Sequence, residues 1–191
     1  MIPTRTLLDA YRAGFFPMAV SGELKWYSPD QRGIVPLDTF RVPRRLDRVL
    51  KHSRFEVSID RVFQQVVVAC GSRPDPAGNW IDDEIIESYA ALHEAGHAHS
   101  IETWHQGTLV GGLYGVALRG AFFGESMFHT MSDASKVALV ELVDRLRTCG
   151  YLLLDIQWLT PHLAQFGAIE VPRVRYLELL AEAMQVDCEF S

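Results

Sequence analysis

The sequence predicts an α+β fold in which helices cover a twisted mixed sheet. Three observations support this prediction. Helical and strand patterns are mixed along the 191 residues, the middle of the chain has the pattern of a β-hairpin, and a strand–helix–strand unit spans residues 122–157. Because both kinds of element must bury an apolar face, a sheet with helices packed on it is the expected architecture.

The size and composition suit one domain with at most a small appendage. Apolar residues make up 48% of the chain, which is ordinary for a globular protein. Cys70, Cys149 and Cys188 have no close spacing, which indicates a reducing compartment rather than a disulfide framework. No apolar run is long enough to span a bilayer. We therefore expect a cytoplasmic protein without a membrane anchor.

Residues 1–33 are expected to form a small N-terminal subdomain ahead of a main domain, residues 34–191. Apolar residues follow Thr4 at helical spacing until Gly14, so we expect a helix with Thr4 as its N-cap. An aromatic turn at 15–18 and a turn-rich loop at 19–31, with a short strand at 24–27, follow this helix. Pro36 cannot donate to a ladder, which makes residues 33–37 an edge strand.

The next segments predict helices on either side of a strand. Pro43 suits a first helical turn, and Asp60 and Asp82 are suitable N-caps for two later helices. The elements expected here are a helix at 44–53, a strand at 55–59, a helix ending at 70, a loop at 71–79 that leads to Trp80, and a helix at 83–94.

The second half of the chain predicts the centre of the sheet. Gln106-Gly107 lies between two runs of β-forming residues, which is typical of a hairpin turn. The expected elements are strands at 98–105 and 108–118, a strand from 121, a helix at 134–148 with a broad apolar face, a strand ending at 157, and helices at 162–166 and 173–184.

Residues 111–128 and the strand end at Asp155 and Gln157 form the candidate site. Five glycines in the first stretch indicate places where a ligand or another backbone comes close, and Glu125 is the one acid there. Asp155 and Gln157 share a face of their strand because side chains alternate. An apolar cleft with a few polar groups is the usual form of a small-ligand site. A glycine-kinked buried sheet with polar strand ends fits the same pattern.

Positive charge is concentrated in one stretch, although the net charge of −6 argues against a general nucleic-acid binder. Within this stretch, residues 41–54, Asp47 is the one acidic residue. Such a run can hold a few phosphates, or it can be the solvated face of a helix. The basic residues are Arg41, Arg44, Arg45, Arg48, Lys51 and Arg54.

The run His93-Glu94-Ala95-Gly96-His97 matches the H-E-x-x-H pattern of zinc hydrolases. That pattern binds zinc when both histidines lie on one helix. Gly96 disfavours a helix that continues to His97, and the residues that follow have a strand pattern. We therefore do not expect a metal site here.

Six motifs occur along the chain in a fixed order: Trp80-Ile81, the run Leu92–Glu102, the glycine-rich stretch, Gly124–Phe128, Ala134-Ser135-Lys136 and Asp155-x-Gln157. In order and separation they resemble bacterial leucyl/phenylalanyl-tRNA–protein transferases. The likeness runs from Tyr11 to about Leu180, which is nearly the whole chain.

The resemblance implies an acetyltransferase-like core preceded by the small N-terminal subdomain. It also implies that Leu or Phe moves from its aminoacyl-tRNA to the N-terminal amine of proteins that begin with Arg or Lys, which marks them for degradation by the N-degron pathway. Donor preference among Leu, Phe and Met stays open. No cofactor, metal or membrane is implied, and the partners are the aminoacyl-tRNA and the acceptor protein.

The resemblance also implies roles for individual residues. Many members of the family carry Trp where this chain has Met18, which removes one stacking surface for adenosine, and Trp26 or Tyr27 is a candidate replacement. The aminoacyl side chain would contact Leu113, Phe122, Met127 and Leu142, and the tRNA would contact Trp80, Arg44, Arg45, Arg48 and Lys51.

The catalytic residues implied are Asp155, Gln157 and Glu125. The amide oxygen of Gln157 accepts hydrogen bonds but is not a base. Gln157 would therefore orient the amine, while Asp155 holds Gln157 in place. Glu125 and Asp155 would supply negative charge for a basic N-terminal residue.

Two alternatives belong to other classes of protein. An acyl-CoA N-acyltransferase would share the core but needs a glycine turn leading into a helix to hold phosphates, whereas Gly111-Gly112 lies within a strand pattern. A non-catalytic binder of basic N-termini would need the acidic cleft but neither Trp80 nor the basic stretch.

Overall fold

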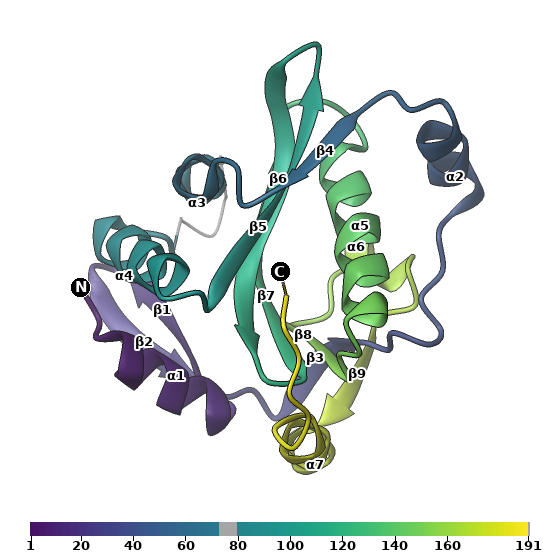
Figure 1. Ribbon diagram of the computed structural model, residues 1–191. Coiled ribbons are helices and arrows are strands. Elements are labelled where there is room, and N and C mark those ends of the chain that lie inside the picture. The colour runs from purple at the N-terminus through teal and green to yellow at the C-terminus, as the bar shows by residue number, and fades with distance from the viewer. Residues whose placement is uncertain (73–79, 191) are drawn as a thin grey trace.

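The predicted architecture, a mixed sheet covered by helices, is confirmed by a computed structural model, which describes residues 1–72 and 80–190 (Figure 1). The strands are β1 Phe16–Val20, β2 Glu23–Tyr27, β3 Gln31–Val35, β4 Glu56–Ile59, β5 Ala98–His105, β6 Thr108–Leu118, β7 Ala121–His129, β8 Leu153–Gln157 and β9 Ile169–Pro172. The helices are α1 Thr4–Arg12, α2 Arg44–Lys51, α3 Phe63–Gly71, α4 Asp83–Glu94, α5 Ala134–Thr148, α6 Pro161–Ala164 and α7 Arg173–Ala183.

Within the described ranges, the main sheet has the strand order β4-β5-β6-β7-β8-β3-β9. Neighbouring strands are antiparallel, except that β7 and β8 are parallel and are joined through α5. The hairpin β1–β2 forms a separate sheet beside α1. The expected domain boundary between residues 33 and 34 falls inside β3.

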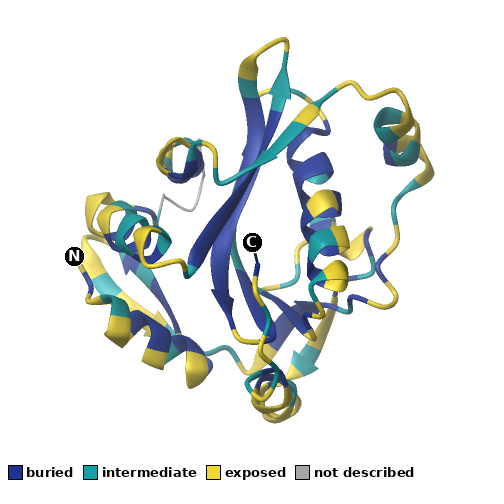
Figure 2. Cartoon of the chain, viewed as in Figure 1, coloured by how far each residue is buried: buried dark blue, intermediate teal, exposed yellow. Residues whose placement is uncertain are grey.

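The sheet buries a different core on each face because its side chains alternate. On β6, Leu113 packs with the side chains of α5, whereas Tyr114 packs with those of α1, α3 and α4. Phe122 and Phe123 of β7 divide in the same way. The central strands are accordingly buried along most of their length, while α1, α2 and α7 expose one side (Figure 2).

The glycines of β6 serve close packing within the protein rather than the approach of a ligand. A Cβ at Gly111 would lie 2.6 Å from the Cβ of Ala134, so glycine lets the start of α5 sit against the strand. A Cβ at Gly115 would collide with the ring of Phe122 and the backbone of Phe123. For these positions the alternative of a glycine-kinked buried sheet is therefore correct.

Periodicity predicted the central elements well. The predicted ranges of α4, β5, β6 and α5 agree with the structure, and the Asp82 carboxylate accepts a hydrogen bond from the backbone N–H of Ile85 as an N-cap does. The hairpin turn at Gln106-Gly107 is also present.

Several local predictions are wrong. Thr4 is already inside α1, whose N-cap is Pro3, and Asp60 does not cap α3. The Asp60 carboxylate instead contacts the His99 ring and accepts the backbone N–H of Ser100. The strand expected at 33–37 is present as β3 but is not an edge strand, because β3 ends before Pro36 and pairs on both sides. β1 occurs where we expected an aromatic turn and the start of a loop, and β9 was not expected, whereas the short strand expected at 24–27 is present as β2. Of the predicted loop at 71–79, residues 73–79 lie outside the described residues.

A buried ion pair ties the N-terminal segment to the sheet. The Arg32 guanidinium of β3 donates to both carboxylate oxygens of Asp155 of β8, over 2.9 and 2.7 Å. It also donates to the Gly14 carbonyl oxygen, and it lies between the rings of Phe16 and Tyr176. Both members of the pair are fully buried. Such a pair is strongly destabilising when one partner is removed, because the other charge stays buried.

Arg32→Met should lower the free energy of unfolding by about 3–5 kcal/mol, because Asp155 would keep a buried charge without its counterion. Urea unfolding at pH 7 measures this. The matched control is Arg12→Met, whose exposed pair with Asp9 should contribute at most about 1 kcal/mol. Equal small losses in both variants would contradict this role for Arg32.

Candidate active site

A cavity of about 590 Å³ opens where the two parallel strands separate. β7 and β8 are paired only from Ala121/Leu153 to Phe123/Asp155, and both strands then continue apart. Residues 124–127 of β7 and 156–158 after the paired segment of β8 line the cavity between them. The site therefore lies where the pairing between β7 and β8 stops, because the two strands diverge beyond Phe123 and Asp155.

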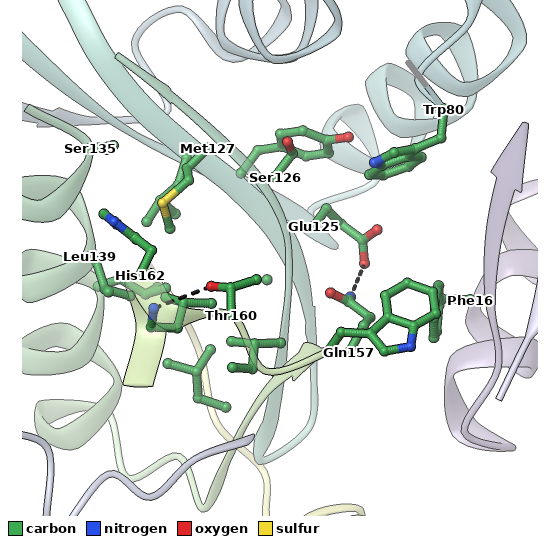
Figure 3. Close-up of a pocket in the computed structure, with 18 of the residues that line it drawn as sticks. Phe16, Trp80, Glu125, Ser126, Met127, Ser135, Leu139, Gln157, Thr160 and His162 are labelled. Atoms are coloured by element: carbon green, nitrogen blue, oxygen red, sulfur yellow. Dashed lines mark hydrogen bonds between the residues drawn. The ribbon is translucent and has the colours of Figure 1, made fainter. Parts of the chain in front are cut away.

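Gln157 is held at the centre of this cavity in a strained conformation. Its φ is +58°, in the left-handed region that non-glycine residues rarely adopt. The Asp155 carboxylate accepts the backbone N–H of Gln157 over 2.8 Å and stabilises this conformation. The Gln157 side chain then reaches Glu125, with Nε2 3.2 Å from Oε1 (Figure 3).

Glu125 lies against two buried tyrosines. The hydroxyls of Tyr11 from α1 and Tyr89 from α4 are 2.8 and 3.0 Å from its two carboxyl oxygens, and they also contact each other. Burial raises the pKa of Glu125 to about 7, although the hydrogen bonds of the two tyrosines act in the opposite direction. Among the described residues that line the cavity, Glu125 carries the one carboxylate.

The two ends of the cavity differ in character. Toward α5 the wall is mostly apolar, with Leu113, Met127 and Leu142, and Ser135 and His162 lie at its margin (Figure 3). Burial and the neighbouring Lys136 lower the pKa of His162, which favours its neutral form.

At the other end, the N-terminal hairpin supplies Phe16 and Met18, and Trp80 and Trp158 complete an aromatic mouth. Trp158 packs edge-on against Phe16 with ring centroids 5.0 Å apart. Tyr27 also contacts this cluster, whereas Trp26 is exposed and does not line the cavity.

Six of the residues expected at the site line this one cavity: Trp80, Leu113, Glu125, Met127, Leu142 and Gln157. Two others lie elsewhere. Phe122 is fully buried in the core under α5 and stacks on Phe190, so it does not line the cavity. Asp155 is also fully buried, and both of its oxygens are occupied by Arg32, so it offers no charge to a substrate.

The expected phosphate-binding residues lie on one exposed helix. Arg44, Arg45, Arg48 and Lys51 all belong to α2 and are exposed, at the edge of the molecule beyond α5 (Figure 1). The Nη2 atom of Arg45 lies 3.8 Å from the Oδ2 atom of Asp133, the residue directly before α5. Ser135, in the first turn of α5, lines the cavity. The basic helix thus adjoins the α5 end of the cavity.

The H-E-x-x-H motif does not have the geometry that zinc requires. α4 ends at Glu94 and Gly96 has φ +77°, so His93 and His97 are not one turn apart on a helix. The His93 ring contacts the Ala98 carbonyl oxygen and stacks on Phe63. No group of three His, Cys, Asp or Glu that could hold a metal occurs in residues 1–72 and 80–190.

Comparison with known families decides the relationship. Residues 34–181 match the model described as leucyl/phenylalanyl-tRNA protein transferase, and residues 1–30 match the model for the N-terminal domain of that protein. The chain belongs to the leucyl/phenylalanyl-tRNA–protein transferase family.

Individual relatives agree with this assignment. The chain is 51% identical to the leucyl/phenylalanyl-tRNA–protein transferase of Rhodopseudomonas palustris strain TIE-1, over 97% of this chain and 84% of that protein. It is also 51% identical to that of Akkermansia muciniphila, over 94% of each. Among solved structures, FemX has a TM-score of 0.57 and 12% identity over 87% of this chain and 66% of that chain, a likeness that concerns the fold alone.

Sequence reasoning missed several residues at the site of this family member. Tyr11 and Tyr89 fall within the helices expected after Thr4 and at 83–94, and nothing in their spacing showed that both hydroxyls reach Glu125. Arg32, the partner of Asp155, lies just before the strand expected at 33–37, and no local signal pointed to this pairing. Trp158 lies next to Gln157 and could have been found from that position alone.

Glu125→Gln should make stability less dependent on pH. The folded state keeps the proton of Glu125 up to about pH 7, whereas an unfolded glutamate releases it near 4.5. The folded state therefore binds more protons in this window, and wild-type stability falls as the pH rises through it. Between pH 5 and pH 8 the variant should gain about 2 kcal/mol relative to wild type, as measured by urea unfolding. The exposed Glu94→Gln is the control and should follow the wild-type profile; parallel profiles for Glu125→Gln would show that Glu125 ionises normally.

Proposed function

We propose that this protein transfers leucine or phenylalanine from aminoacyl-tRNA to the N-terminal amine of an acceptor protein. The observation that supports this most strongly is the composition of one cavity in a member of this transferase family. Along this cavity an apolar slot is followed by a polar centre of Glu125 and Gln157, and then by an aromatic mouth with Trp80.

Each part of the cavity suits one part of the substrates. Leu113, Met127 and Leu142 can surround an aliphatic or aromatic side chain, and methionine adapts to either shape. Trp80 can stack on the terminal adenine, a contact that contributes about 1–3 kcal/mol. The ester carbonyl then lies beside Gln157, whose amide can orient an incoming amine.

The reaction needs positioning more than strong activation. An α-amino group has a pKa of about 7.7–8.0, so a fair fraction is neutral at pH 7. Its nitrogen attacks the ester carbonyl carbon, a C–N bond forms, the bond to the ribose 3′-oxygen breaks, and one proton passes from the nitrogen to that oxygen. The ester is already activated, so no cofactor is required. Holding the two reactants together can lower the barrier by several kcal/mol.

Acceptor proteins that begin with Arg or Lys fit the charge of the cavity. Glu125 can face a cationic side chain or the amine itself, whereas Asp155 is neutralised by Arg32. The product would carry a bulky apolar N-terminus, which the N-degron pathway recognises. Because aminoacyl-tRNA is the donor, we place the reaction in the cytoplasm. None of the helices in the described part of the chain has the length and apolar character that crossing a bilayer demands.

The direct test is transfer of labelled leucine from leucyl-tRNA to a peptide that begins with Arg, with acetyl-CoA and the same peptide in a parallel reaction. The proposal expects a leucylated peptide in the first reaction and no product in the second. Acetylation would indicate an acyl-CoA enzyme instead, and peptide binding without either product would indicate a non-catalytic binder.

Met127→Ala should shift donor preference from Leu toward Phe by about tenfold in kcat/KM, because a larger slot loses contacts with leucine but still holds a phenyl ring. Competition between leucyl- and phenylalanyl-tRNA measures the ratio. Phe122→Leu is the control, since its side chain lies in the core outside the cavity. A shift in the control but not in Met127→Ala would place the aminoacyl side chain elsewhere.

Replacing Arg44, Arg45 and Arg48 by Gln should weaken tRNA binding and reduce the slope of log K against log salt concentration by about 2–3, roughly one per lost phosphate contact. Filter binding at several salt concentrations measures this slope. Arg175→Gln on α7 removes an exposed arginine elsewhere and should leave the slope unchanged. An unchanged slope in the α2 variant would exclude this helix as the phosphate-binding surface.

A further inference from the structure

The carboxyl group of Glu125 and the hydroxyls of Tyr11 and Tyr89 form a closed ring of oxygens. Tyr11 contacts Oε1 over 2.8 Å, Tyr89 contacts Oε2 over 3.0 Å, and the two hydroxyls are within hydrogen-bonding contact of each other. Both tyrosines are fully buried, and they come from α1 and α4. One side of the ring faces the cavity through Glu125.

Counting protons shows that the ring can hold one proton more than the two phenols supply. Three oxygen–oxygen contacts need three protons, and each phenol supplies one. If both phenols donate to an ionised Glu125, the carboxylate keeps two hydrogen bonds, and no proton remains between the two tyrosine oxygens. If Glu125 carries the third proton, the carboxyl donates to Tyr89, Tyr89 donates to Tyr11, and Tyr11 donates back to Oε1. Every contact is then a hydrogen bond.

We propose that Glu125 is the base that accepts the proton of the attacking amine, and that Tyr11 and Tyr89 are positioning residues that share this proton with it in a closed ring. This inference rests on the transfer reaction proposed above. Glu125 touches the reacting amine, whereas the tyrosines act through Glu125.

The proton balance of the step is complete. Before reaction the ring releases its proton to solvent, which leaves Glu125 as a carboxylate. When the amine nitrogen bonds to the ester carbon, one N–H proton moves to a Glu125 oxygen and the ring closes. When the bond to the 3′-oxygen breaks, Glu125 gives that proton to the leaving oxygen. The products are an amide and a ribose hydroxyl, and Glu125 is again a carboxylate.

The surroundings of Glu125 favour this role. Tyr176 of α7, Gln157 and the Arg32–Asp155 pair also surround Glu125, and the opposite charges of that pair largely cancel, while Tyr114 of β6 packs against Tyr89. Asp155 cannot accept the proton instead, because Arg32 occupies both of its oxygens and it does not line the cavity. The pKa of Glu125, which burial raises to about 7, lies close to the working pH, where a general base is most effective.

Carbon-13 NMR of protein labelled at the glutamate carboxyls tests the ring without any reaction. The Glu125 resonance, assigned by its loss in Glu125→Gln, should titrate near pH 7. Tyr11→Phe and Tyr89→Phe should move this titration to higher pH, because each removes a hydroxyl that stabilises the carboxylate. Tyr151→Phe, a buried tyrosine outside the ring, is the matched control and should leave it unchanged. A Glu125 carboxyl that stays ionised down to pH 5 would overturn the proposal.

Single-turnover leucyl transfer to an Arg-initiated peptide tests the catalytic role. Wild type should show a rise in rate through pH 7 beyond the titration of the amine, and Glu125→Gln, which keeps only the latter, should be about 100-fold slower at pH 8. In Tyr11→Phe and Tyr89→Phe the rise should move to higher pH and the rate should recover toward wild type at pH 9.

A purely structural role for the tyrosines would lower their rates equally at every pH, and that result would overturn the proposal. Full activity of Glu125→Gln would do so as well. If wild type itself transferred nothing, the transfer function would fail, and the NMR titration would still decide whether the ring holds a proton.

Discussion

The buried pair between Arg32 and Asp155 is the constraint on which the site depends. It joins β3 to β8, reaches Gly14 after α1, and is enclosed by Phe16 and Tyr176. The same Asp155 carboxylate accepts the backbone N–H of Gln157 and so stabilises a left-handed residue at the end of β8. A single ion pair therefore fixes the N-terminal segment against the sheet and aims Gln157 into the cavity.

The two carboxylates that the sequence predicts at the site, Asp155 and Glu125, have different roles. Asp155 is neutralised and acts on the backbone, whereas Glu125 meets only hydroxyl and amide groups and faces the cavity. A charge that already has a buried partner cannot serve a substrate, while a carboxyl without a cation can bind a proton or an amine. The difference in partners, rather than in residue type, thus assigns the chemistry to Glu125.

The sequence predicted those features that depend on local pattern. The 3.6-residue period located α4 and α5, and the two-residue period with a Gln-Gly turn located β5 and β6. It could not predict that Phe122 lies outside the cavity, because Phe122 shares the α5 face with Leu113 and Leu142 but stacks on Phe190, a contact with a residue distant in the chain. Nor could it pair Arg32 with Asp155, or Tyr11 with Tyr89 and Glu125, since these contacts join residues that are distant in the chain and form only when the sheet is complete.

A crystal structure with a non-hydrolysable leucyl-adenosine, in which an amide replaces the ester at the ribose 3′ position, tests the account most directly. We expect the leucyl side chain between Leu113, Met127 and Leu142, the adenine against Trp80, and the amide carbonyl within about 4 Å of both Gln157 and Glu125, close enough for an amine to bridge them. An analogue bound outside this cavity, or one whose carbonyl points away from Glu125, would contradict the account.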